Sequence, residues 1–198
     1  MKIIELIIDE NSQDFGVSAV SVVENPAIEI DFVKLKKHEV LLKADEEKKI
    51  LLGAGLVPNK QIYRFDESIG EYYIYFSKDT VRKASELFLK SGNQKNATFE
   101  HEYDIDGMTV VESWIVDDPE VDKAKLYGFN VPEGTWMLSM KCENSKVWDA
   151  VLSGDVKGFS IEGHFADKLD MKKVVSKDEK LLQKVKDIIN EYEKNNKK

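Results

Sequence analysis

The chain has 198 residues, the usual size of one globular domain and short for two. Its 29 basic and 37 acidic residues give a formal charge of −8, which argues against duplex nucleic acid as the main partner. The single cysteine, Cys142, excludes an intrachain disulfide and a multi-cysteine zinc site, and His38, His101 and His164 are too scattered for a zinc-protease helix motif.

The first residues, MKIIELIIDE, carry no signal-peptide cleavage site, and no stretch of the chain approaches the ~18 apolar residues of a membrane helix. We therefore expect a soluble intracellular protein without a signal peptide or transmembrane segment. Residues 1–43 are predicted to be extended, because KIIELIID and VSAVSVV are β-branched runs, broken at Asp14–Gly16 and at Asn25-Pro26.

Residues 50–165 show a strand-rich pattern into which helices are inserted. The aromatic run Glu71–Phe76 predicts a strand, and the segment after it predicts a helix that is capped by Ser77 and ends at Gly92. A second helix is expected at Asn144–Ser153. Further strands are expected near 97–105, 108–116, 135–142 and 158–165. The pattern predicts an α+β domain, residues 1–166, built around a mostly antiparallel β-sheet or β-barrel with flanking helices.

Residues 167–198 are predicted to form a basic linker and a C-terminal amphipathic helix. They hold 10 Lys and seven acidic residues, a net charge of +3, which leaves −11 on the first 166 residues. Apolar residues recur there at helical spacing, at Leu181, Leu182, Val185, Ile188, Ile189 and Tyr192. Two interpretations remain open: the helix docks on its own domain, or it binds a partner or dimerises.

The pair Asp106-Gly107 lies between two β-type runs and predicts a two-residue β-hairpin. In that register His101 lies directly opposite Glu112, with Cβ atoms ~4.5–5.5 Å apart on one face of the sheet. Glu112 could then accept a hydrogen bond from the imidazole and fix its tautomer. A slip of one residue would move Glu112 to the other face, so the prediction depends on the register.

A second polar group is expected in KGFSIEGHF, where a strand begins near Gly158. Strand alternation places Ser160, Glu162 and His164 on one face, and the apolar Phe159, Ile161 and Phe165 on the other. A serine near an imidazole that a third group orients is the arrangement of nucleophilic acyl transfer. On composition alone, ordinary polar pairing on a sheet surface explains these residues better.

Several motifs, in their order, resemble the phage XkdF-like serine protease family, whose relatives are prohead maturation proteases. They are GVSAVSVVENPAIEIDF, IYR, EYYIYFS, FEH, VVESWIVDDPEVDKAKLYGF, GTWMLSMKCEN and KGFSIEG, and they cover residues 16–165. The resemblance implies an assemblin-like fold, as in the herpesvirus proteases: a small, mostly antiparallel β-barrel surrounded by helices, with a Ser–His pair on strands.

The resemblance also implies roles for single residues. Ser160 in GFSIEG corresponds to the nucleophile, and His101 in FEH corresponds to the general base. For a third catalytic residue that orients the histidine, the hairpin argument favours Glu112, and Glu162 and His164 are the alternates. His164 lies four residues along the strand from Ser160, ~13 Å away, which is far for a group that must touch His101. The mechanism requires no metal and no organic cofactor.

The resemblance finally implies where such an enzyme acts. Its partners would be scaffold and major capsid precursor proteins, cleaved inside the assembling procapsid in the host cytoplasm, and self-cleavage and homo-oligomers are compatible with it. Neither a membrane nor a specific nucleic acid is expected as a partner. The alternative is a non-enzymatic head-assembly or scaffold-associated protein that retains the protease fold, and a weaker one is a ligand-binding β-barrel.

Overall fold

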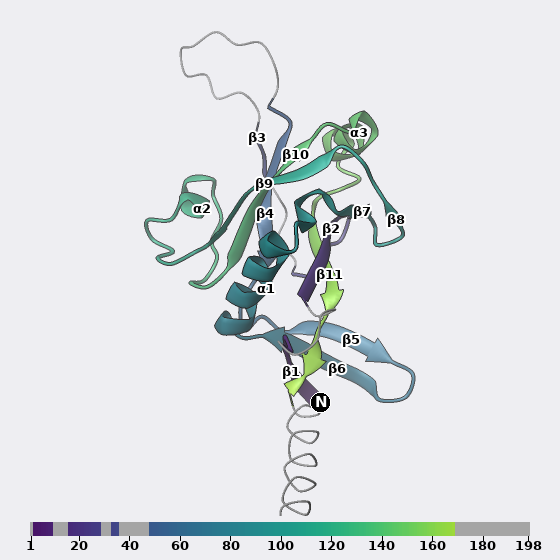
Figure 1. Cartoon of the computed structure of the whole chain (residues 1–198), viewed down its shortest axis with the longest axis vertical. Helices are drawn as coiled ribbons and strands as arrows, with labels where there is room; N and C mark the ends of the chain where they lie inside the picture. Colours follow the sequence, from purple (N-terminus) through teal and green to yellow (C-terminus); the bar gives the residue numbers. More distant parts are fainter. Residues whose placement is uncertain (1, 10–15, 29–32, 36–47, 169–198) are drawn as a thin grey trace, which may run out of the picture.

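A computed structural model describes residues 2–9, 16–28, 33–35 and 48–168 (Figure 1). The predicted C-terminal helix and most of the charged stretch 43–49 lie outside the described residues. In the described part of the chain, no helix has the length and apolar character that crossing a membrane requires.

Strands dominate the described residues, and few helices accompany them. The strands are β1 (Lys2–Ile7), β2 (Gly16–Val23), β3 (Val33–Leu35), β4 (Ile50–Leu56), β5 (Ile62–Asp66), β6 (Gly70–Phe76), β7 (Ala97–Phe99), β8 (Tyr103–Asp104), β9 (Met108–Ile115), β10 (Trp136–Cys142), β11 (Gly158–His164) and β12 (Ala166–Asp167). The helices are α1 (Lys78–Lys90), α2 (Lys123–Leu126) and α3 (Ser145–Ser153), with a 3-10 turn at Asn93–Lys95.

The strands form three four-stranded sheets with the orders β12-β1-β6-β5, β3-β4-β10-β9 and β11-β2-β7-β8. Most neighbours are antiparallel, but β1 pairs with β6, and β2 with β7, in parallel. The predicted α+β class is therefore confirmed. The alternative of a β-barrel is wrong for the described residues, whose sheets keep separate edges and do not close on themselves. Nothing in this topology tests the expected likeness to assemblin.

Both predicted helices are confirmed, because their boundaries are set by short-range capping. The Ser77 side chain accepts a hydrogen bond from the Thr80 amide at the start of α1. At α3, the Asn144 side chain accepts from two backbone amides, and Gly154 ends the helix with a φ of 85°. Each cap satisfies amide or carbonyl groups that the helix itself leaves without a partner.

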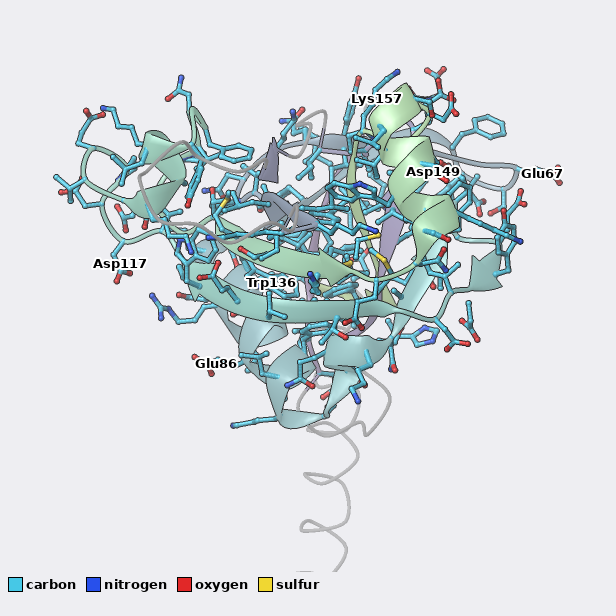
Figure 2. The ribbon with its side chains drawn as sticks, turned by 90° about the horizontal axis from the view of Figure 1, so that it is seen from above. Glu67, Glu86, Asp117, Trp136, Asp149 and Lys157 are labelled. Carbon is cyan, nitrogen blue, oxygen red and sulfur yellow. The ribbon has the colours of Figure 1, made fainter. Side chains whose placement is uncertain are left out.

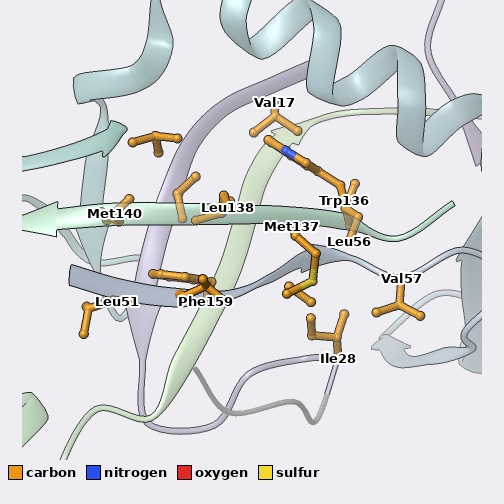
Figure 3. Packing of buried hydrophobic residues seen from close by; sticks show 14 of the residues in the cluster. Val17, Ile28, Leu51, Leu56, Val57, Trp136, Met137, Leu138, Met140 and Phe159 are labelled. Carbon is orange, nitrogen blue, oxygen red and sulfur yellow. The ribbon is translucent and has the colours of Figure 1, made fainter. Parts of the chain in front are cut away.

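The core lies between the sheets and is covered on one side by α1 (Figure 3). Trp136 on β10 is fully buried and packs edge-on against Phe88 of α1, with ring centroids 5.5 Å apart. Phe159 of β11 enters the same cluster from the opposite sheet. In Figure 2, Trp136 lies within the body, whereas Glu86, Asp117 and Asp149 point outward. The strand that carries Ser160 is thus anchored by the apolar residue next to it.

The predicted hairpin at Asp106-Gly107 is wrong. The strand after this turn, β9, pairs with β10 of one sheet, whereas the strand before it, β8, pairs with β7 of another. The chain therefore crosses between two sheets at Gly107, whose φ is 78° and whose carbonyl accepts a hydrogen bond from the Glu143 amide at 2.7 Å. β9 forms a long ladder with β10, and β8 forms a short one with β7, so the turn signal at Asp106-Gly107 does not set the pairing.

Candidate active site

The sheet β11-β2-β7-β8 brings the predicted serine strand next to the strand that precedes His101. Its register pairs Ser160 with Ser21, Ser21 with Thr98, and Thr98 with Asp104. Residues paired in this way place their side chains on one face of the sheet. The other face carries Phe159 and its apolar neighbours, and Phe159 is 1% exposed. The predicted alternation along β11 therefore gives the sheet one apolar and one polar face.

His101 lies in a tight turn directly after β7. Glu100 and His101 both have left-handed backbones, with φ values of 50° and 61°. The Glu100 carboxylate accepts a hydrogen bond from the Glu24 amide at 2.6 Å. The His101 amide donates to the Ser21 hydroxyl at 3.1 Å. The end of β2 thus holds the turn and directs the imidazole over the polar face.

Glu162 is the carboxylate that meets His101. The imidazole Nδ1 lies 3.0 Å from Glu162 Oε1, and the Thr98 hydroxyl donates a hydrogen bond to the same oxygen. A carboxylate only accepts hydrogen bonds, so a neutral imidazole here carries its hydrogen on Nδ1 and keeps a free lone pair on Nε2. This is the tautomer that a general base needs.

Ser160 shares the polar face with these groups. It is half-buried, lies two residues from Glu162 along β11, and lies opposite Ser21, a cross-strand distance of ~4.5–5.5 Å between Cβ atoms. Among the described residues, no hydrogen bond joins the Ser160 hydroxyl to His101. Catalytic hydrogen bonds often tighten only when substrate binds, so this geometry is compatible with an unliganded Ser–His pair.

Two cavities flank the serine strand. A small one of about 40 Å³ lies beside Ser160 and is lined mainly by apolar side chains, among them Ile28, Leu56, Ile62, Phe76 and Phe165. A larger polar cavity of about 460 Å³ borders Glu162 and is lined also by Ser18, Asn96, Thr98, Asp104 and Asp106. The serine strand therefore has a small apolar cavity beside Ser160 and a larger polar cavity beside Glu162.

Glu112 does not contact His101, so the predicted pairing of these two residues is wrong. Its carboxylate accepts hydrogen bonds from Lys123 Nζ at 2.6 Å and from the Ser139 hydroxyl at 2.5 Å. The Lys123 hydrogen bond, with that of Ser139, lowers the pKa of Glu112 below its ordinary value. Lys123 also lies 4.4 Å from the centre of the Trp114 ring. Glu112 and Trp114 thus tie α2 to β9 and β10, which is a structural role.

The remaining alternate, His164, is exposed at the far end of β11, where it pairs with Gly16. The described residues contain no group of three or more His, Cys, Asp and Glu side chains that could hold a metal ion. Of the three candidates, Glu162 is the one whose side chain contacts His101 in the described part of the chain.

Sequence reasoning missed Ser21 and Thr98, two buried hydroxyl residues that contact His101 and Glu162. Ser21 is fully buried and Thr98 is 6% exposed. The only signal in the sequence is a serine inside the β-branched run VSAVSVV, where a buried polar side chain needs a partner. The partner of the Ser21 hydroxyl is the Thr98 carbonyl, which lies 77 residues away along the chain.

Comparison with known proteins gives one match. A family model described as "Putative phage serine protease XkdF" matches residues 37–170, more than half of the chain. No curated protein and no solved structure matches.

Proposed function

Because this chain belongs to the phage XkdF serine protease family, we propose that it is a head-maturation serine endopeptidase. It cleaves scaffold and major capsid precursor segments through an acyl-enzyme in which Ser160 is the nucleophile and His101 the general base. Glu162, rather than Glu112, is the residue that orients His101. The observation that carries the proposal is the 3.0 Å contact between His101 Nδ1 and Glu162, on the sheet face that Ser160 shares.

Each step of the reaction has a residue suited to it. His101 Nε2 takes the proton of the Ser160 hydroxyl as its oxygen attacks the substrate carbonyl, and Glu162 stabilises the imidazolium that forms. His101 then gives that proton to the leaving amine, which departs as the acyl-enzyme forms. A water molecule, deprotonated by the same Nε2, hydrolyses the ester and regenerates Ser160.

The assignment of partners and place rests on the family. Prohead proteases act inside the assembling procapsid in the infected host cell, and residues 167–198, with a net charge of +3, are suited to recruit the acidic body to that assembly. Self-cleavage in this basic segment and assembly into homo-oligomers are compatible with the same role. No cofactor takes part.

The test is co-expression of the chain with its scaffold and capsid proteins. Ser160→Ala is expected to leave the precursors uncut, whereas Ser153→Ala, a substitution of an exposed serine on α3, is expected to process them as the wild type does. Mass spectrometry of the new termini identifies the cleavage sites. Normal processing by Ser160→Ala would refute the proposal.

One observation favours a second function, that of a non-enzymatic head-assembly protein with the protease fold: the Ser160 hydroxyl makes no hydrogen bond to His101. The two functions differ in reactivity toward a fluorophosphonate, which labels an activated serine. Labelling of the wild type and not of Ser160→Ala supports the protease. An unlabelled wild type that still assembles heads supports the scaffold-associated protein.

A further inference from the structure

We propose that Ser21 is a positioning residue that holds the general base His101 in place for reaction with Ser160. Ser21 lies in β2, before the residues that match the family, so the match does not assign it a role. The proposal rests on the proposed function, because a positioning role has meaning only if His101 acts as a base.

Ser21 lies at the centre of the sheet, between the serine strand and the histidine strand. Its neighbours in the register are Ser160 on β11 and Thr98 on β7. The side chain is fully buried. Its hydroxyl accepts a hydrogen bond from the His101 amide at 3.1 Å and donates one to the Thr98 carbonyl at 3.4 Å. The hydroxyl therefore joins the backbone of the base to the strand that precedes it.

The turn that carries His101 needs such an anchor. Two successive non-glycine residues with positive φ, Glu100 and His101, are unfavourable unless the surroundings hold them. Three hydrogen bonds tie this turn to β2 and to the residue that follows it: Ser21 accepts from His101, Val22 accepts from Glu100 at 3.2 Å, and the Glu24 amide donates to the Glu100 carboxylate. Of these, only the Ser21 bond is made by a side chain of β2.

Ser21 and Glu162 fix different parts of the same residue. Glu162 holds the imidazole ring, and Ser21 holds the peptide from which that ring extends. Without the Ser21 hydroxyl, the turn can relax toward ordinary φ values, and the ring then loses its fixed position relative to Ser160. Misplacement of a catalytic group lowers the rate of the chemical step and leaves substrate binding unchanged.

The experiment measures inactivation by a fluorophosphonate, which separates the limiting rate kinact from the binding constant KI without a known substrate. Ser21→Ala is expected to lower kinact about tenfold, the equivalent of one lost hydrogen bond, with KI unchanged. Ser139→Ala is the matched control, because Ser139 is equally buried and its hydroxyl is bonded to Glu112 in another sheet. This control is expected to lose stability without losing kinact.

A double-mutant cycle separates positioning from stability. If Ser21 acts through His101, then adding Ser21→Ala to His101→Ala causes no further loss of kinact. Ser21→Cys, which replaces the hydroxyl by a weaker acceptor, is expected to fall between wild type and Ser21→Ala. It serves if the alanine variant does not fold. Two results would overturn the proposal while the protease function stands. One is an equal kinact for Ser21→Ala and wild type, and the other is that Ser21→Ala lowers kinact as much in the His101→Ala variant as in the wild type. An unlabelled wild type would instead refute the protease function itself.

Discussion

Replacement of Glu162 by glutamine tests the central contact of the site. Glu162→Gln keeps the shape of the side chain and an oxygen that can accept from Thr98, but it removes the negative charge 3.0 Å from His101 Nδ1. In the proposed mechanism, the imidazolium that forms during acylation then loses its stabilising partner. The amide can also present an N–H to the ring and favour the wrong tautomer.

The size of the effect follows from the exposure of the pair. A hydrogen bond to a charged group is worth about 1.5–3 kcal/mol. The side chains of His101 and Glu162 are 42% and 29% exposed, so solvent screening favours the lower end of that range. A loss of about 1.5 kcal/mol corresponds to a fall in kinact of roughly tenfold. This is far below the ~10⁴-fold loss seen when a fully buried orienting acid is neutralised.

The assay is the same fluorophosphonate inactivation, with Glu112→Gln as the matched control. Both variants replace a carboxylate that lies within hydrogen-bond distance of two other side chains, but only Glu162 contacts His101. Wild-type kinact in Glu162→Gln would refute the assigned role. A larger loss in Glu112→Gln than in Glu162→Gln would restore Glu112 as the third member of the site.

The remaining predictions concern stability and are measured by urea and thermal unfolding. Gly163→Ala is expected to disrupt the pairing of β11 with β2, because its Cβ would lie 2.1 Å from the Gly16 carbonyl oxygen. In Gly154→Ala the new Cβ meets open space at a φ of 85°, so this variant is expected to lose only about 1–2 kcal/mol of unfolding free energy. Equal stability of the two variants would contradict this. Glu112→Gln is expected to cost up to about 1 kcal/mol at neutral pH. The folded-state pKa of Glu112 lies below its unfolded value, so its stabilisation is full above the unfolded pKa and is lost as the pH falls through the folded pKa. The difference in unfolding free energy between wild type and Glu112→Gln should therefore close in acid. A gap that is independent of pH would show that the Lys123 and Ser139 contacts do not act through the charge.

The features that sequence predicted correctly are local ones. Ser77 and Asn144 cap their helices through groups within three residues, so their identities are sufficient to place the helix starts. The alternation of β11 likewise requires only that Phe159 be buried. The same alternation puts Ser160 and Glu162 on a common face.

The hairpin failed because strand pairing is not local. Asp106-Gly107 is a strong turn signal, yet β9 forms its ladder with β10, and β7 forms its ladder with β2 from the start of the chain. The predicted pairing of Glu112 with His101 depends on a hairpin register that these ladders replace. The contact of His101 with Glu162 joins residues 61 positions apart, and no short-range pattern in a single sequence encodes it.

The central place of β2 also determines when the site can exist during synthesis. Residues of β2 pair with β7 and with β11, and the contact between Ser18 and Glu162 spans 144 positions of the chain. The sheet therefore cannot be completed until residue 164 has left the ribosome, at a synthesis rate of about 5–20 residues per second. On a growing chain His101 therefore cannot contact Glu162 before that moment, and the proposed Ser160–His101 site is assembled only when the sheet is complete.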